Sequence, residues 1–446
     1  MRSETMVGLL AALVLGSVSS QLQGSLLYLD LEATSPAYEL ALRALRLSDL
    51  SVSTVLQLGP SESFFDQAAV CDGNGTYYVT VQHPGPPVDP FVPDDSCHPA
   101  CATKTGGGIC CRDPRAPPAV EGTCYGVADC ADMNSGHSEL AETIAITLPT
   151  ASAPAASVAS RMNTSTCIKL FATPAPGTVL CLAPPSSATV GATLQRFDLL
   201  ARSAEVIGTF PAGLGSMNEA AAYDAKAGVV WAYLGAMAGG GQQQRSGGGS
   251  RKSTGVGVTG GSPGRYRGAS SYDGGGGGGG GNSASFAAHS MNVHTGELGP
   301  ITAFPPNSIV SDFVCDNAGG GAVLAAYSEL VSSNPVTWTK TLARLQPPQS
   351  AGAAWSASAL GGNDTFGVQV GKACEPGTWA GAAKACYGQL NNAFIGNGVF
   401  FLTAFAHGPP ETLLGVSTKT GEALLEFPAQ RSNLIDMAWT AWEMAP

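Results

Sequence analysis

The sequence predicts an all-β fold, a β-propeller of six four-stranded blades, with seven blades as the alternative. Three observations lead to this prediction. One hairpin-like phrase recurs along the chain, a second phrase alternates with it, and the composition disfavours helices. Charged residues make up 12% of the chain and 58 of its 446 residues are glycine, so turns are many and helix-favouring Glu and Lys residues are few.

The first phrase is a short apolar run, a Gly/Asn/Asp turn and a second apolar or aromatic run. Gly-rich turns supply the positive φ angles of tight hairpins, so each copy predicts two antiparallel strands. The last copy gives only the first half of the phrase. The copies are DQAAVCDGNGTYYVTVQ from Asp66, NEAAAYDAKAGVVWAYLG from Asn218, SDFVCDNAGGGAVLAAYSE from Ser311, NNAFIGNGVFFLTAFA from Asn391 and LIDMAWTAW from Leu434.

The second phrase is a strand, a polar turn and a second strand that ends at proline. It occurs at residues 192–211, 289–305 and 412–428, and the segment from Arg43 follows the same outline. Two hairpins in alternation make one four-stranded blade. This fixed order of two phrases favours a propeller over the rival structure, a β-sandwich, which also has short strands at regular spacing.

The spacing between copies tests the number of blades. First strands begin near residues 66, 218, 310, 389 and 434, and the segment from Ser165 fits as a degenerate sixth copy. Two gaps contain insertions, a cysteine-rich segment at 91–136 and a Gly-rich segment at 236–283. Without the insertions these gaps shrink to roughly 53 and 44 residues, close to the length of one propeller blade. The gap from 310 to 389 contains either a third insertion or an extra blade.

The two ends of the chain are predicted to complete one blade together. The C-terminal copy stops after one strand, and SLLYLDLE from Ser25, followed by RALRLSDL and VSTVLQLG, supplies the three missing strands. We expect an antiparallel ladder between residues near 26–31 and residues near 436–442. Such pairing removes the exposed strand edges of an open ring.

The pattern AAYDAKAGVVWAY followed by MNVHTGELGPITAF resembles the blade repeats of YVTN- and NHL-type β-propellers. The resemblance covers most of the chain after residue 20. It implies that the first strand of each blade lines the central channel and that a Thr-Gly turn joins the outer strands. The sequence has no series of WD dipeptides and no series of kelch double glycines, so it indicates no named subfamily.

Residues 1–20 predict secretion. Arg2 precedes an apolar run at 6–15, and Val18 and Ser20 suit a signal-peptidase site. The run is too short for a bilayer, which needs about 20 apolar residues, and no later run is long enough. We therefore expect an extracellular protein without a membrane span, with the propeller over residues 21–446. Three sequons predict glycosylation, at Asn74, Asn163 and Asn363.

Six of the twelve cysteines lie in the insertion at 91–136. Its Gly- and Pro-rich sequence has little apolar surface to bury, so cross-links must hold it together. A knot of three disulfides is favoured over a zinc site that would use His98, because secreted chains use cysteine mainly for disulfides. The cysteines of this cluster are Cys97, Cys101, Cys110, Cys111, Cys124 and Cys130.

The other cysteines suggest local pairs and two thiols. Cys167 and Cys181 flank a predicted hairpin symmetrically and are expected to form a disulfide across it. A bridge between Cys374 and Cys386 would close a loop. The remaining two occupy matching positions of the repeat in separate blades, too far apart to bridge, and are expected as buried free thiols. They are Cys71 and Cys315.

The Gly-rich insertion predicts a flexible loop, because it has almost no residues that form a core. It carries five Arg or Lys residues against one Asp. A Gly/Arg-rich element that binds RNA does not suit a secreted protein. The net charge of −11 also argues against a nucleic-acid partner, since phosphates require clustered Lys and Arg residues.

Catalytic signals are few. The chain lacks the HExxH, Walker and EF-hand patterns, and His289 and His294 are poorly spaced for shared ligation, so no metal and no other cofactor is expected. Asp66, Asp312 and Asp436 fall on predicted first strands, where their side chains could enter the channel as the paired carboxylates of a glycosidase. Such residues more often accept hydrogen bonds from backbone N–H groups at the ends of channel strands.

The leading hypothesis is a secreted, monomeric propeller scaffold that binds an extracellular protein or glycan and is not an enzyme. The alternative is a glycan-active hydrolase or lyase that uses the channel-mouth carboxylates. Two or more of the three aspartates within about 10 Å of each other would favour the enzyme. The fold does not choose between these hypotheses, because propellers host both roles.

Overall fold

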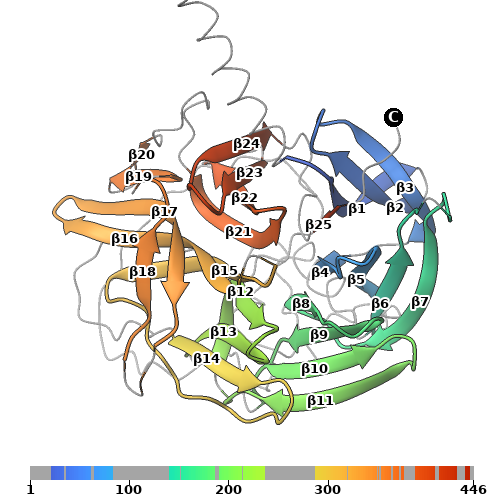
Figure 1. Cartoon of the computed structure of the whole chain (residues 1–446), viewed down its shortest axis with the longest axis horizontal. Helices are drawn as coiled ribbons and strands as arrows, with labels where there is room; N and C mark the ends of the chain where they lie inside the picture. Colours follow the sequence, from blue (N-terminus) through green and yellow to red (C-terminus); the bar gives the residue numbers. More distant parts are fainter. Residues whose placement is uncertain are drawn as a thin grey trace, which may run out of the picture.

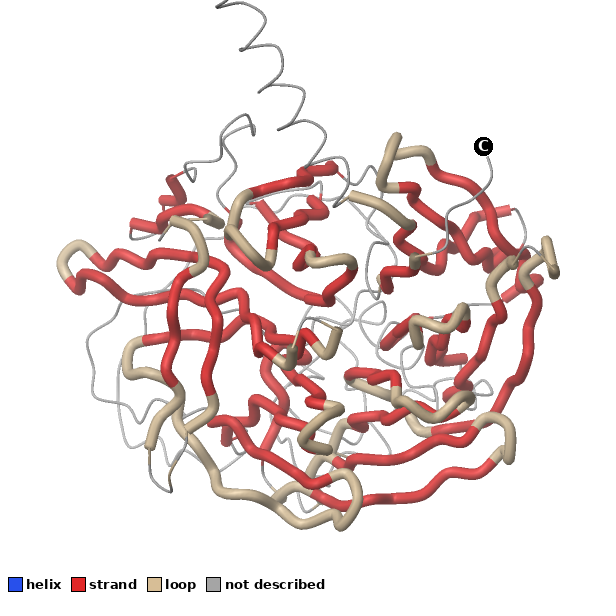
Figure 2. Tube along the Cα trace, in the orientation of Figure 1, coloured by secondary structure: helices blue, strands red, loops and turns tan. Residues whose placement is uncertain are grey.

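Six β-sheets stand around a central axis as the blades of a propeller (Figure 1; Figure 2). The computed structural model describes residues 22–441 apart from several gaps. The long gaps are 84–139, 237–286 and 376–386, and the short ones are 35–36, 62–64, 151, 186–189, 213, 319, 349, 351–352, 363–364, 371–372, 407–410 and 429–436. Within the described residues, no helix is long and apolar enough to cross a bilayer.

The blades are numbered here in chain order, and the strands of each are given from the channel outward. Blade 1 contains β25 (Ala438–Thr440), β1 (Ser25–Thr34), β2 (Ala37–Arg46) and β3 (Val52–Ser61). Blade 2 contains β4 (Phe65–Cys71), β5 (Thr76–His83), β6 (Leu140–Thr147) and β7 (Ser157–Thr164). Blade 3 contains β8 (Lys169–Ala172), β9 (Thr178–Ala183), β10 (Thr193–Asp198) and β11 (Ser203–Thr209).

The second half of the ring is less regular. Blade 4 contains β12 (Leu214–Asp224), β13 (Val229–Ala236) and β14 (Ala287–Asn292). Blade 5 contains β15 (Ser308–Asp316), β16 (Ala322–Ser333) and β17 (Val336–Gln346), followed by β18 (Ser356–Ala359), β19 (Gly367–Val370) and β20 (Ala373–Glu375). Blade 6 contains β21 (Tyr387–Gly396), β22 (Val399–Ala406), β23 (Glu411–Ser417) and β24 (Ala423–Pro428).

The predicted closure of the ring is confirmed. Strand β25 pairs antiparallel with β1, and the register places Leu26 opposite Trp439 and Leu27 opposite Ala438. The Trp439 ring lies against Gly396 of blade 6, where an added Cβ would collide with it. Its indole N–H donates to the backbone carbonyl of Gln23, 3.0 Å away. One short strand therefore joins the last blade to the first.

Apolar side chains fill each junction between neighbouring blades. Six clusters of buried residues account for the six junctions, and each draws its members from two adjacent sheets. Sheets that pack face to face around a ring exclude the rival β-sandwich, in which two sheets share a single core. Each blade thus buries apolar side chains against both of its neighbours.

The structure corrects two details of the predicted repeat. The phrase at 289–305 does not form a full hairpin: its second half pairs with β14 only through the isolated bridges Met291 to Leu298 and Ala288 to Thr302. Pro300 lies between these bridges and has no N–H to donate, so a regular outer strand cannot continue there. In blade 1, β2 begins at Ala37 rather than near Arg43, because the segment LSDL forms the following turn.

The long gap between the fifth and sixth first strands contains a third insertion and no extra blade. Its strands β18, β19 and β20 join the sheet of blade 5. Trp355, in this insertion, enters the core between blades 4 and 5, and Phe366 enters the core between blades 5 and 6. The insertion therefore braces three blades at the rim.

The up-and-down order of strands gives the ring two distinct faces. The loops between second and third strands lie on the face where the first strands begin. Both long insertions are loops of this kind: one leaves at His83 and returns at Leu140, and the other leaves at Ala236 and returns at Ala287. We call this side the insertion face. The turns between first and second strands lie on the opposite face.

Candidate functional site

The channel is lined by the six innermost strands, β25, β4, β8, β12, β15 and β21, each of which contacts the next around the ring. Four of these strands pair irregularly with their neighbours within the blade. The irregularities lie between Asp66 and Ala68, Ser216 and Ala221, Val310 and Asp312, Tyr387 and Gln389, and Asn391 and Phe394. A bulge bends the strand and changes the direction of the side chain that follows it.

Of the three predicted channel carboxylates, Asp312 is the one whose side chain lies in the described part of the chain. It follows the irregularity in β15 and is fully buried. Lys169, the first residue of β8 in blade 3, places its Nζ 2.9 Å from Oδ2 and 3.2 Å from Oδ1 of Asp312. The backbone N–H groups of Phe313 and Ala393 also donate to the carboxylate. Lys169 Nζ donates in addition to the carbonyl of Ala393, 3.3 Å away.

Both oxygens of the Asp312 carboxylate accept hydrogen bonds in this arrangement. Burial raises the pKa of the Asp312 carboxyl above its ordinary value, while the Lys169 ammonium and the two backbone N–H groups act in the opposite direction. A general acid needs a free edge toward its substrate. Three donor groups of the protein itself make four hydrogen bonds to Asp312, so the geometry is that of a structural ion pair.

The other two candidate aspartates cannot be compared with Asp312 by distance. Asp66 lies on β4, opposite Val81, but its side chain is outside the described part of the chain. Asp436 falls in the gap at 429–436. The 10 Å criterion for paired carboxylates is therefore not tested.

Lys169 was not among the residues predicted from the sequence. It lies in the degenerate blade copy STCIKLFA, at a point where the other copies have Ala, Asp or Asn. A lysine in an otherwise apolar first strand is a usable signal, because Lys is almost never fully buried without a partner. The side chain is in fact mostly buried and paired.

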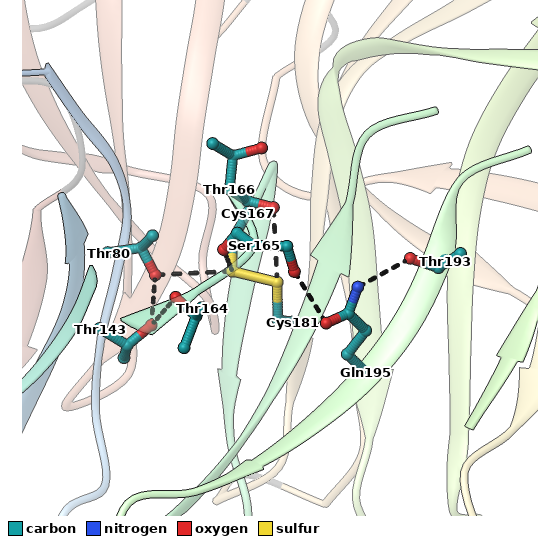
Figure 3. The surroundings of a disulfide bond; sticks show 9 residues. All are labelled: Thr80, Thr143, Thr164, Ser165, Thr166, Cys167, Cys181, Thr193 and Gln195. Carbon is teal, nitrogen blue, oxygen red and sulfur yellow. Dashed lines mark hydrogen bonds between the residues drawn. A yellow bond between two sulfur atoms is a disulfide. The ribbon is translucent and has the colours of Figure 1, made fainter. Parts of the chain in front are cut away.

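A disulfide joins Cys167 and Cys181, as expected, with the two Cα atoms 5.5 Å apart (Figure 3). The two residues are not directly opposite, however, because Cys167 precedes β8 and the register partner of Cys181 is Leu170. The Thr80 hydroxyl lies 3.5 Å from Cys167 Sγ, so the bridge fixes the blade 2 to blade 3 linker close to β5.

The two expected free thiols are observed. Cys315 is buried and Cys71 is half-buried. Burial raises the pKa of both thiols, to about 12 for Cys315, and nearby aspartates add to the effect. Neither thiol has the lowered pKa of a reactive cysteine. The cluster at 97–130 and Cys386 lie outside the described residues, so their pairing stays a prediction.

The remaining predicted site residues lie apart from the channel. Asn74 is exposed in the β4 to β5 turn, on the opposite face, and Asn163 is exposed on the outer strand β7. Asn363 lies outside the described residues. His289 is buried on β14 and His294 lies exposed in the turn that follows. In the described part of the chain, no group of three His, Cys, Asp or Glu side chains is placed to hold a metal ion.

Comparison with known proteins adds a distant likeness in fold. No protein-family model and no curated protein sequence matches the chain. Among solved structures, it is similar to a prolyl endopeptidase, with a TM-score of 0.39 and 10% identity over 94% of this chain and 51% of that one. An oligogalacturonate lyase in complex with manganese gives 0.33 and 9% over 91% and 75%.

The propeller domain of the Trilobed protease from Pyrococcus furiosus gives a TM-score of 0.32 and 9% identity, over 88% of this chain and 79% of that one. The chain spans about half the length of the prolyl endopeptidase and of a second peptidase that it resembles. These likenesses are too distant to bear on activity. The fold assignment rests on the strand order of the chain itself.

Proposed function

We propose that this protein is a secreted propeller scaffold that binds an extracellular protein or glycan through its insertion face. The observation that carries the proposal is the common origin of the two long insertions. They start from different blades, at His83 and Ala236, yet both leave the ring on the same side. Loops presented by a rigid scaffold are a frequent means of recognition.

Secretion is supported by the leader-like sequence at 1–20 and by the disulfide between Cys167 and Cys181. Disulfides persist in oxidising compartments and are rare in the cytosol. We further infer N-glycans on Asn74 and Asn163, because both side chains are exposed. Asn74 lies on the opposite face, so a glycan there leaves the insertion face free, whereas Asn163 pairs with Glu142 close to the root of the first insertion.

We assign the blades to the YVTN and NHL type as part of the same proposal. The turn Thr295-Gly296 follows β14, and the turn Thr420-Gly421 joins β23 to β24. In both turns the Thr hydroxyl and the Glu two residues later are within hydrogen-bonding distance. A Thr-Gly turn between outer strands is the feature that the resemblance implies.

The test is a binding screen with variants matched by face. The protein, expressed through a secretory pathway, is screened against arrays of extracellular glycans and matrix proteins. Variants replace 91–136 or 236–283 by a short Gly/Ser bridge, and the control Lys226→Ala changes an exposed turn on the opposite face. We expect binding to fall at least about tenfold, or roughly 1.4 kcal/mol, in one or both deletions and to stay unchanged in the control. Binding that survives both deletions would contradict the proposal.

The alternative, a glycan hydrolase or lyase, is ranked second because Asp312 is already engaged by Lys169. The same preparation, incubated with glycans that bind, distinguishes the two. Turnover that Asp66→Asn or Asp436→Asn abolishes would favour the enzyme. Size-exclusion chromatography with light scattering tests the expected monomer.

A further inference from the structure

We propose that the ion pair between Lys169 and Asp312 determines which blades meet across the channel when the ring assembles. Lys169 belongs to blade 3, Asp312 to blade 5 and Ala393 to blade 6. The pair therefore skips blade 4 and crosses the channel. Three blades that are not all neighbours in the chain become joined at one point.

The inner hairpins of this sequence resemble one another. Four of its hairpins follow the same phrase, and their inner strands are rich in Ala, Val and Phe. Apolar faces of similar shape pack against one another in more than one order, and repeat proteins misassemble by this route. A polar group that is satisfied only by one particular partner removes the wrong orders.

The burial of the pair suits it to select one arrangement of the blades. Exposure of the Asp312 side chain is 1% and that of Lys169 is 16%. A blade out of place would leave a buried carboxylate or ammonium without its partner, which is far more costly than a poor apolar contact. The correctly assembled pair gains little net stability over apolar residues, since desolvation offsets the attraction. Its main effect is on which arrangement forms.

The geometry identifies the donors as well as the charges. Phe313 N–H binds Asp312 from the same strand, whereas Ala393 N–H binds it from the next blade, at an irregular point of β21. The carboxylate thus fixes blade 6 beside blade 5 while Lys169 approaches from blade 3, two places away around the ring. Any other order of these three blades breaks at least one of the contacts.

The experiment compares assembly with stability. Parent, Lys169→Met, Lys169→Gln and the core variant Leu324→Ala are unfolded in urea without reductant, so that disulfides stay closed, and refolded by dilution. Leu324 is buried between blades 5 and 6, so its truncation is a control that lowers stability without removing either charged group of the pair. Hydrogen exchange at the amides of Phe313 and Ala393 measures the correctly assembled fraction.

We expect Lys169→Met to recover about threefold less correctly assembled protein than Leu324→Ala, compared at urea concentrations that give equal stability. Lys169→Gln keeps a hydrogen-bond donor without the charge and should fall between the two. If Lys169→Met does not fold, Lys169→Gln is compared with Leu324→Ala in its place. Equal recovery at equal stability, in whichever comparison applies, overturns the proposal, and so does exchange at Ala393 that is unchanged by both substitutions.

Discussion

Closure of the ring by β25 yields a prediction whose size can be worked out. Truncation after Asn433 removes β25, with Met437 and Ala438 buried and Trp439 half-buried. Full burial of a side chain such as Met is worth about 1.5 to 3 kcal/mol and burial of a single methyl or methylene group about 0.8 kcal/mol, so buried Met437, buried Ala438 and half-buried Trp439 together contribute about 5 kcal/mol. Their loss also uncovers Leu26 and Leu27, which are now fully buried.

A domain has a total stability of only about 5 to 15 kcal/mol. The truncated chain should therefore be close to unfolding at room temperature, or should melt about 10 °C or more below the parent, since a large domain loses a few degrees per kcal/mol. The whole ring should respond, because blade 1 buries apolar side chains against both blade 2 and blade 6. Calorimetry and far-UV circular dichroism measure the effect.

The matched control is truncation after Ala441, which keeps β25 and removes only residues 442–446. This control should melt with the parent. The reasoning is refuted if truncation after Asn433 also melts with the parent, or if it shows an early partial transition while the rest of the ring melts unchanged.

Three further predictions concern the insertions, the thiols and pH. Replacement of 91–136 by a short Gly/Ser bridge should leave cooperative melting intact, and a deletion that unfolds the chain contradicts this. Trp355→Ala should lower the free energy of urea unfolding by about 3 to 5 kcal/mol, because Trp355 is buried, its ring centroid lies 5.5 Å from that of Trp231, and its indole N–H donates to Thr302. An unchanged free energy of unfolding in Trp355→Ala contradicts this expectation. At pH 8, iodoacetamide should modify neither Cys71 nor Cys315 in the native protein and should modify both in urea, because burial raises the pKa of each thiol in the folded state. Peptide mass spectrometry measures the labelling, and labelling of either thiol in the native protein would show that it is not protected. Burial lowers the pKa of His289 below the value of 6.5 that applies in the unfolded chain. The unfolded state therefore binds the proton more readily, and the free energy of unfolding should fall as the pH drops below about 6.5. This fall should be smaller in His289→Asn, and an equal dependence of unfolding free energy on pH in the two proteins would contradict the prediction.

The ring could be predicted from the sequence because its hairpins are local. A turn such as Asp72 to Gly75 predicts a pair of antiparallel strands within 20 residues, and the repetition of such turns predicts the blades. The pairing of Leu27 with Ala438 was also within reach, since an incomplete last copy needs a partner at the other end. Both inferences follow from periodicity alone.

The polar channel site was only half predicted. Asp312 stood out as a charged residue on a first strand, but its partner Lys169 lies 143 residues away, in the copy that follows the pattern least. No local pattern links two such positions. The brace formed by Trp355 was missed for a similar reason, because an insertion that packs on neighbouring blades has no period of its own.

The shared blade of the two termini also sets the direction in which the molecule can be attached. Ser25 lies opposite Thr440, and Gly24 contacts the backbone of Thr440, so both ends of the ring leave from the same place. That place is where first strands end and second strands begin, on the side away from His83 and Ala236. A tag, a surface linker or a fused domain attached there is therefore on the opposite side of the ring from the roots of the two insertions. Immobilisation through one terminus, then the other, should present the same side of the propeller to solution.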